Sequence, residues 1–192
     1  NTLTQPVGTT NASGVATGTL SATVAEGKTV SATINGVAIT QTAAVTVVAG
    51  AVSAAQSTVS ASPTTITAST GTSTITVTAK DANDNPIAGA TVVLAATGTG
   101  NTLTQPVGTT NASGVATGTL SSTVAEGKTV SATISGVAIT QTAAVTVVAG
   151  AVSASQSTVS ASPTTITAPS GTSTITVTAK DADGNPIAGA TV

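Results

Sequence analysis

The second half of the chain repeats the first half with a period of 100 residues. Residues 101–192 match residues 1–92 at all but seven positions. The seven pairs are Ala22/Ser122, Asn35/Ser135, Ala55/Ser155, Ser69/Pro169, Thr70/Ser170, Asn83/Asp183 and Asp84/Gly184. A self-similar chain is divided by its period before any rule about domain size is applied, so each unit has about 100 residues. A unit of that size can bury a core of its own without a metal or a disulfide.

Strict alternation of apolar residues with Thr predicts the clearest strand. The run Thr74–Ala79 places Ile75, Val77 and Ala79 on one face of an extended chain and Thr residues on the other. A period of two residues over this length is typical of a strand with one buried face. We therefore expect Ile75 to lie in the core.

The same alternation recurs later in the unit. The run Lys128–Ile134 places Val130, Ala132 and Ile134 on the inward face, and residues 139–148 alternate in the same way. Clusters of Gly, Pro, Asn or Asp separate the runs, as turns require. The candidate strands of one period are 56–61, 64–68, 72–80, 90–96, 101–105, 115–123, 128–134 and 137–148. Because each strand has one apolar face to bury, the predicted fold class is all-β, a two-sheet antiparallel sandwich in tandem copies.

The composition excludes several classes of function. The chain has no aromatic residue, no His, Cys or Met, and only 5% charged residues. Stiff, β-branched Thr, Val and Ile are abundant, so we expect no helix. A net charge of −2, with Lys as the only basic residue type, cannot neutralise a row of phosphates, which excludes nucleic acid as a partner. The most apolar stretch, Ala143–Val152, is too short to cross a bilayer, so we expect no membrane span in this segment.

The period also sets where one unit ends and the next begins. We expect one complete domain over residues 50–149, preceded by the C-terminal half of a repeat over 1–49. The N-terminal half of a further repeat follows over 150–192. The joint Val147–Ser153 is short and contains neither Pro nor charge, so successive domains should stack end to end and add about 30 to 40 Å each. We expect the chain to be a window onto a longer array.

Three segments carry a resemblance to a known family. They are 157–163 (STVSASP), 175–190 (ITVTAKDADGNPIAGA) and 109–116 (TTNASGVA). With them the unit resembles the bacterial Ig-like domain type 1 of invasin and intimin-like adhesin stalks, and the resemblance covers the whole chain. It implies an Ig-like sandwich and an extracellular place on the bacterial surface. Asp84 departs from the Gly that the family has in this turn, but Asp tolerates the left-handed conformation, so the fold is unaffected.

A weak candidate for a calcium site lies in the segment after the clearest strand. Asp181, Asp183 and Asn185 alternate in a way that resembles the start of a calcium loop. The sixth and twelfth positions of such a loop call for Gly and Glu, and here they are Pro186 and Val192. A plain hairpin turn is the alternative, and the sequence favours it.

The remaining polar features have structural interpretations. Glu126 and Lys128 flank a Gly, which predicts a solvated ion pair across a hairpin. Lys80 beside Asp81 suggests a Lys–Asn isopeptide crosslink, with an exposed charge at a strand end as the alternative. Asn111–Ser113 fits a glycosylation pattern but is interpreted as a turn. With no His or Cys to activate Ser or Thr, we expect no enzymatic activity and no cofactor.

The sequence leaves three functions open. The first is a structural spacer that holds the binding region of an adhesin away from the cell. The second is a module that binds glycan or a host protein directly, although it lacks the aromatic and Arg anchors that such sites recruit. The third is a subunit of a fibre in which identical chains associate.

Overall fold

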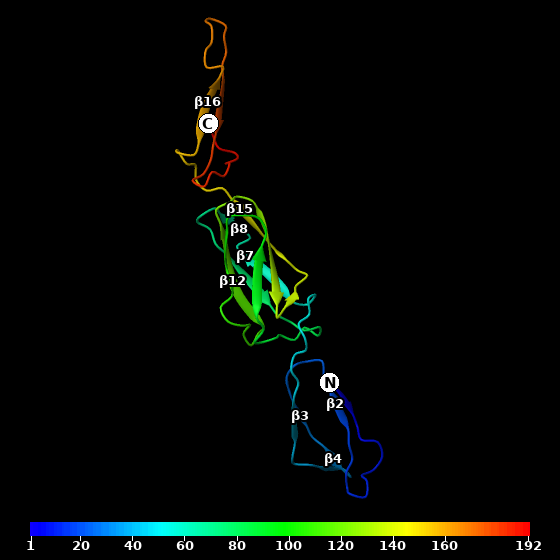
Figure 1. Ribbon diagram of the computed structural model, residues 1–192. Coiled ribbons are helices and arrows are strands. Elements are labelled where there is room, and N and C mark those ends of the chain that lie inside the picture. Colours follow the sequence, from blue (N-terminus) through cyan, green and yellow to red (C-terminus); the bar gives the residue numbers. More distant parts are fainter.

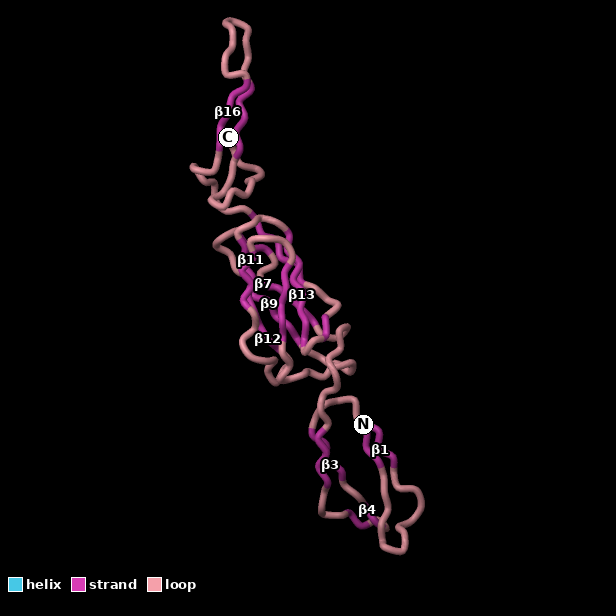
Figure 2. The backbone as a smooth tube through the Cα atoms, viewed as in Figure 1, coloured by secondary structure: helices cyan, strands magenta, loops and turns pink.

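The computed structural model describes all residues, 1–192, and every regular element in it is a β-strand. The chain forms an elongated body with a closed sandwich in the middle and an open strand assembly at each end (Figure 1). We call residues 1–49 the first half-unit, 50–149 the central unit and 150–192 the second half-unit. Figure 2 shows that strands run along the length of all three segments and that loops lie between them.

The first sheet of the central unit is entirely antiparallel. Its strands, in spatial order, are β11 (Asn101–Thr104), β12 (Val115–Ser122), β9 (Ser73–Thr78) and β7 (Thr58–Ser62). The pairing of β12 with β9 runs from Val115 opposite Thr78 to Leu120 opposite Ser73. This pairing joins the two halves of the unit, because β9 comes from the first half and β12 from the second.

The second sheet has five strands. They are β10 (Val92–Ala96), β13 (Gly127–Ile134), β15 (Ala143–Val148) and β8 (Thr65–Thr67) in that order, with β14 (Val137–Ala138) also paired to β13. Strand β8 runs parallel to β15, and the other pairs are antiparallel. With β7 and β8 counted as one split first strand, the two sheets follow the strand order of a constant-type immunoglobulin domain. The predicted Ig-like fold class is therefore confirmed.

The core lies between the two sheets and is built from aliphatic side chains alone. Ile75, Val77 and Leu120 are fully buried from the first sheet, and Val130 and Ile134 are fully buried from the second. These residues stand at alternate positions because successive side chains of a strand point to opposite faces. The inward faces predicted for residues 74–79 and 128–134 are confirmed.

One predicted strand, 137–148, is wrong as a single element. Strand β14 ends at Ala138 and β15 begins at Ala143, and the residues between them turn toward the opposite sheet. There the side-chain oxygen of Gln141 accepts a 3.1 Å hydrogen bond from the N–H of Val59. The other strands differ from the predicted ranges by at most two residues at either end.

Each half-unit keeps the local strand pairing of the central unit but lacks an opposing partner. The first half-unit contains β1 (Thr2–Thr4), β2 (Thr19–Ser21), β3 (Gly27–Val30), β4 (Thr33–Ile34), β5 (Val37–Ala38) and β6 (Ala43–Thr46). The second contains β16 (Thr158–Ser162) and β17 (Thr174–Thr178). Most of their apolar side chains are exposed. Both half-units therefore leave apolar faces of their strands uncovered.

Candidate functional site: the joint between units

The Asp–Asn turn that follows β9 and β17 is held by several hydrogen bonds to one carboxylate. In the first copy, Asp81 Oδ1 accepts hydrogen bonds from the N–H of Asn83 (2.8 Å) and from the N–H of Asn85 (3.0 Å). A short Asp side chain stabilises its own turn in this way. Asp84 takes a φ of +70° and its counterpart Gly184 a φ of +85°, which confirms that Asp tolerates the left-handed position here.

The second oxygen of Asp81 fixes the side chain of Asn85. Asp81 Oδ2 accepts hydrogen bonds from Asn85 Nδ2 (2.9 Å) and from the N–H of Gly50 (2.8 Å), which is the first residue of the unit. In the other copy, Asp181 makes the corresponding bonds to Asn185 (2.8 Å) and Gly150 (2.9 Å). The carboxylate thus connects the entry of the unit to the turn and sets the orientation of the Asn amide.

The Asn amide then binds the backbone of the preceding unit. Asn185 Nδ2 donates to the carbonyl oxygen of Thr123 (2.9 Å), and Asn185 Oδ1 accepts from the N–H of Ala125 (2.9 Å). At the other joint, Asn85 makes the same pair of bonds to Thr23 and Ala25, both 2.8 Å long. A donor and an acceptor on one planar amide bind two backbone groups at once, so the bond pair resists rotation about the joint as well as separation.

Both carboxylates of the joint are held in the charged form. Asp81 is 3% exposed and Asp181 is 1% exposed. Hydrogen bonds from the Asn85 side chain and then from the Gly50 N–H lower the pKa of Asp81 to about 2. For Asp181, burial is the largest single influence and would raise the pKa, but the hydrogen bonds from Asn185 and Gly150 together lower it. Hydrogen bonds to the ionised carboxylate therefore lower its pKa by more than the loss of water on burial raises it.

A further hydrogen bond crosses the joint between the central unit and the second half-unit. Ser69 Oγ donates to Asp183 Oδ2 at 2.5 Å, and the Ser69 N–H donates to the carbonyl oxygen of Ser122 at 2.9 Å. Ser69 has a φ of +63°. Its counterpart is Pro169, which has no N–H and cannot take that φ. Ser69 and Asp183 are both among the seven differences between the copies, so part of the sequence variation falls on the joints.

The predicted ion pair of Glu126 and Lys128 is present, but the prediction that it is solvated is wrong for Lys128, whose side chain is fully buried. Lys128 is the second residue of β13 and lies on the same inward face as Val130. Its Nζ donates to Glu126 Oε1 and to the carbonyl oxygen of Thr99 (2.5 Å), while the Thr99 N–H donates to Glu126 Oε1 (2.8 Å). These hydrogen bonds, from Lys128 first and Thr99 second, lower the pKa of Glu126.

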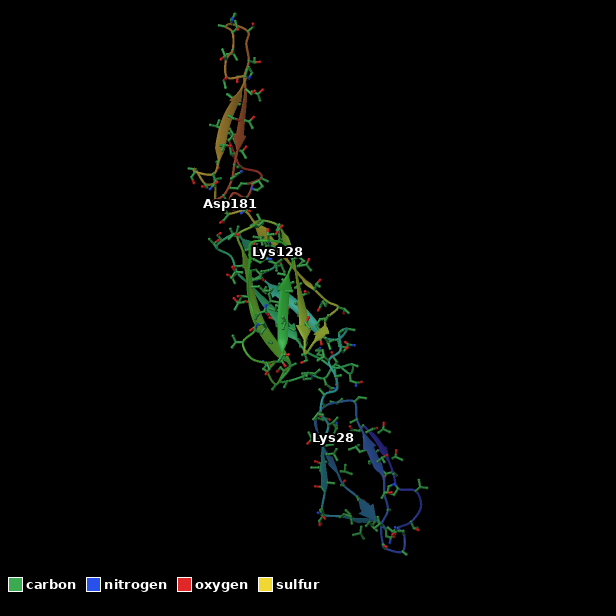
Figure 3. All side chains as sticks on the ribbon, viewed as in Figure 1. Lys28, Lys128 and Asp181 are labelled. Carbon is green, nitrogen blue, oxygen red and sulfur yellow. The ribbon has the colours of Figure 1, made fainter.

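The hydrogen bonds of Lys128 hold the loop that Asn185 binds. Glu126 follows Ala125 directly in the loop between β12 and β13, so the ion pair fixes one end of the segment that Asn185 binds. Figure 3 shows Lys128 and Asp181 near the same joint, one in each unit, and Lys28 at the corresponding place in the first half-unit. Lys28 pairs with Glu26 there. The ion pair therefore recurs at both joints, and the contacts with Thr99 are made at the second joint.

The three candidate calcium ligands face different partners. Asp181 accepts N–H bonds on both oxygens, Asp183 Oδ2 accepts the Ser69 hydroxyl, and Asn185 Oδ1 accepts the Ala125 N–H. The structure contains no cluster of three or more Asp, Glu, His or Cys side chains suited to holding a metal ion. The arrangement is that of a hydrogen-bonded turn at the joint, and the weak calcium candidate stays untested.

Two other polar segments also have structural roles. Lys80 Nζ forms an ion pair with Asp84 Oδ1 at 2.8 Å, and this pair is absent from the second copy, where Gly184 replaces Asp84. Asn111 Oδ1 accepts hydrogen bonds from the N–H groups of Ser113 (2.9 Å) and Val115 (3.0 Å). The predicted turn at Asn111 is confirmed.

Comparison with known proteins identifies the family. The model of the family described as invasin, domain 3, matches residues 53–150. The chain belongs to this family. No curated protein sequence gives a significant match. The chain contains no helix of the length and apolarity that crossing a membrane would need.

Three solved structures are similar to this member of the invasin domain 3 family along most of its length. The Escherichia coli adhesin FdeC is 34% identical over 86% of the chain, with a TM-score of 0.63. Yersinia pseudotuberculosis InvD is 29% identical over 97% of the chain, with a TM-score of 0.64. Invasin, described as a bacterial integrin-binding protein, is 26% identical over 97%, with a TM-score of 0.64. The chain spans 53%, 60% and 40%, respectively, of the lengths of those three chains.

Proposed function

We propose that this chain is part of the stalk of a bacterial cell-surface adhesin and acts as a spacer that projects a distal binding region. The observation that carries the proposal is the repeated Asn clamp, in which Asn85 and Asn185 bind the loop of the preceding unit through the same pair of hydrogen bonds. A clamp that recurs at every joint fixes the angle between neighbours. Fixed angles convert a string of domains into a rod.

The relatives support the same role. FdeC is described as an adhesin and invasin as an integrin-binding protein. Their kinship supports an extracellular place on the bacterial surface and a non-enzymatic function for this chain. The absence of aromatic and Arg residues argues against direct binding of a host protein by these units, because such residues supply most of the binding energy of protein interfaces.

Small-angle scattering on an array of three complete units tests the proposal. We expect the maximum dimension to grow by about 30 to 40 Å with each added unit, as strands aligned with the long axis require. A matched array with Ala in place of Asn85 at each joint should keep its units folded but have a smaller radius of gyration. A compact particle from the unaltered array would contradict the spacer function. Tight binding of glycan or host protein by a single unit would favour the adhesive module instead.

A further inference from the structure

The first and last strands of the central unit lie side by side and run in the same direction. Strand β8 belongs to the beginning of the unit and β15 to its end, and they pair in parallel with Thr65–Thr67 beside Thr146–Val148. Every other strand pair of the structure is antiparallel. The parallel direction places the entry and the exit of the unit at opposite ends.

A pull along the chain would load this parallel pair in shear. The neighbouring half-units are attached at opposite ends of the central unit (Figure 1). Tension would therefore draw β8 toward the first half-unit and β15 toward the second, and the two strands would have to slide past each other with all their hydrogen bonds strained together. Terminal strands that paired antiparallel would have their entry and exit at one end, so their hydrogen bonds would open one after another.

Backbone hydrogen bonds close both ends of the parallel pair. At one end, the Thr146 N–H donates to the carbonyl oxygen of Thr64 at 2.8 Å. At the other end, the Ala68 N–H donates to the carbonyl oxygen of Val148, also at 2.8 Å. The inner side of the pair faces the core, where Ile66 is 4% exposed. Hydrogen bonds beside such dry surroundings are electrostatically stronger than those in water, so the pair resists sliding.

The same pair opposes both ways in which a pulled unit could begin to open. If the beginning of the unit were drawn out, β7 would have to leave β9 and β8 would have to leave β15. If the end of the unit were drawn out, β15 would have to leave both β13 and β8. The pairing of β8 with β15 is the one strand pairing that both routes must break.

The entry of the unit is fastened before the tension reaches β7. The Gly50 N–H donates to Asp81 Oδ2 at 2.8 Å, and the Ser53 N–H donates to the carbonyl oxygen of Lys80 at 2.8 Å. The Lys80 N–H in turn donates to Ser57 Oγ at 3.0 Å. These bonds attach the entry segment to the residues that follow β9, so the load reaches the strands along their axes.

The exit of the unit is held on its other side by the loop that receives the Asn clamp. The Val147 N–H donates to the carbonyl oxygen of Glu126 at 3.0 Å. The neighbouring Ala125 N–H donates to Asn185 Oδ1 of the following unit. Part of the tension therefore passes from the following unit into this loop through the clamp, and the rest passes through the chain into β15. A joint fixed in this way keeps the pull aligned with β15, as shear requires.

We propose that each complete unit bears tension along the chain, and that the parallel pairing of β8 with β15 is the contact that must break before the unit unfolds under force. The inference rests on the proposed stalk function, because a stalk anchored at one end and attached at the other carries such tension. A spacer needs only to be long, whereas these units would also keep their length under load. Scattering measures the length and a force measurement the resistance, so either property can fail without the other.

Single-molecule force measurements on the whole chain test the direction of loading. The chain has no Cys, so two introduced thiols can attach the handles at chosen residues. Ala51→Cys with Ala149→Cys pulls on the two ends of the central unit, and this unit should hold until one abrupt rupture. Ala51→Cys with Ala82→Cys pulls on two positions at one end of the β7–β9 pair, which should open at less than half that force because its bonds break in turn. Equal forces in the two directions would overturn the proposal.

A matched pair of valine variants tests which strands carry the load. Val147→Ala truncates a side chain of β15 that is 3% exposed, and Val92→Ala truncates one of β10 that is 6% exposed. Strand β10 lies at the opposite edge of the same sheet from β8 and takes part in neither opening route. Forced unfolding is governed by the unfolding rate rather than by equilibrium stability. Both variants should therefore lower the melting midpoint to a similar extent, but only Val147→Ala should lower the rupture force between residues 51 and 149. An equal fall in rupture force for the two variants, or none for Val147→Ala, would overturn the proposal.

Discussion

Asn185 donates a 2.9 Å hydrogen bond from Nδ2 to the carbonyl oxygen of Thr123, a residue of the preceding unit that lies 62 positions earlier in the sequence. The Asp181 carboxylate holds the amide in place from the other side. The result is a connection in which one Asn side chain at each joint makes two hydrogen bonds to the preceding unit. The orientation of the Asn185 amide is thus set by Asp181, a residue of its own unit.

Replacing the clamp Asn by Asp tests this connection more sharply than truncation does. Asn85→Asp keeps the shape of the side chain but turns a donor into an acceptor, and the new carboxylate would lie beside Asp81. Both the bond to Thr23 and the bond to Asp81 would be replaced by repulsion. We expect an array with this change at every joint to bend freely near pH 7, as seen by a reduced radius of gyration in scattering. Asn85→Ala should have a smaller effect, since it removes the bonds without adding charge.

The pH dependence of unfolding follows from Asp81. Its pKa is lowered from 3.8 to about 2 in the folded protein, so the unfolded chain binds the proton more readily. The stabilisation is complete above the unfolded pKa and is lost as the pH falls from about 4 toward 2. Glu126, whose pKa is also lowered, should add to the loss as it becomes protonated.

Thermal melting of the central unit from pH 7 to pH 2 measures this effect. The midpoint should be level near neutral pH and fall below about pH 4. Asp81→Asn should have a lower midpoint at pH 7 and a shallower fall on acidification. An Asp81→Asn variant that lost as much stability on acidification as the original unit would show that Asp81 does not carry the effect.

The sequence predicted the strands well and the joints poorly, and the reason is physical. Alternation in 74–79 and 128–134 is a local pattern, so it identifies both the strands and the faces they bury. The Asp181–Asn185 segment shows its own turn locally, but the partners of Asn185 lie far away in the sequence, and Ser69 is 114 positions from Asp183. Lys128 is an intermediate case. Its alternation with Val130 indicates an inward side chain, but the nearby Glu126 led to the prediction of a solvated ion pair instead.

Lys128 should stabilise the unit chiefly through its buried stem. Lys128→Ala removes that stem from the end of the core and leaves the carbonyl of Thr99 without its donor. We expect a loss of about 2 to 4 kcal/mol in the free energy of unfolding, as for other buried aliphatic truncations. Lys128→Met keeps most of the stem and should cost less than half as much. Denaturant titrations of the central unit would measure both, and equal losses would show that the charge, rather than the stem, dominates.

The two copies of one residue give a matched test of the core. Ile75→Ala should cost about 2 to 5 kcal/mol, because it leaves a cavity between two sheets. Ile175→Ala changes the same residue type in the same strand context, but Ile175 is exposed. That variant should leave the melting midpoint of the central unit unchanged. An unaltered midpoint for Ile75→Ala would place Ile75 outside the core.

Ser69→Pro introduces into the central unit the residue found in the second copy and should loosen the joint that follows. Proline has no N–H to donate to Ser122 and no hydroxyl to donate to Asp183, and it cannot take the positive φ of Ser69. The Asn185 clamp would remain, so the joint should gain mobility without separating. Hydrogen exchange should show faster exchange at the Ala125 N–H in the variant than in the original chain. Ser69→Ala keeps the backbone hydrogen bond, so its exchange rate at the Ala125 N–H should lie between those of the original chain and of Ser69→Pro. An unchanged rate in both variants would mean that the Asn185 clamp alone fixes the joint.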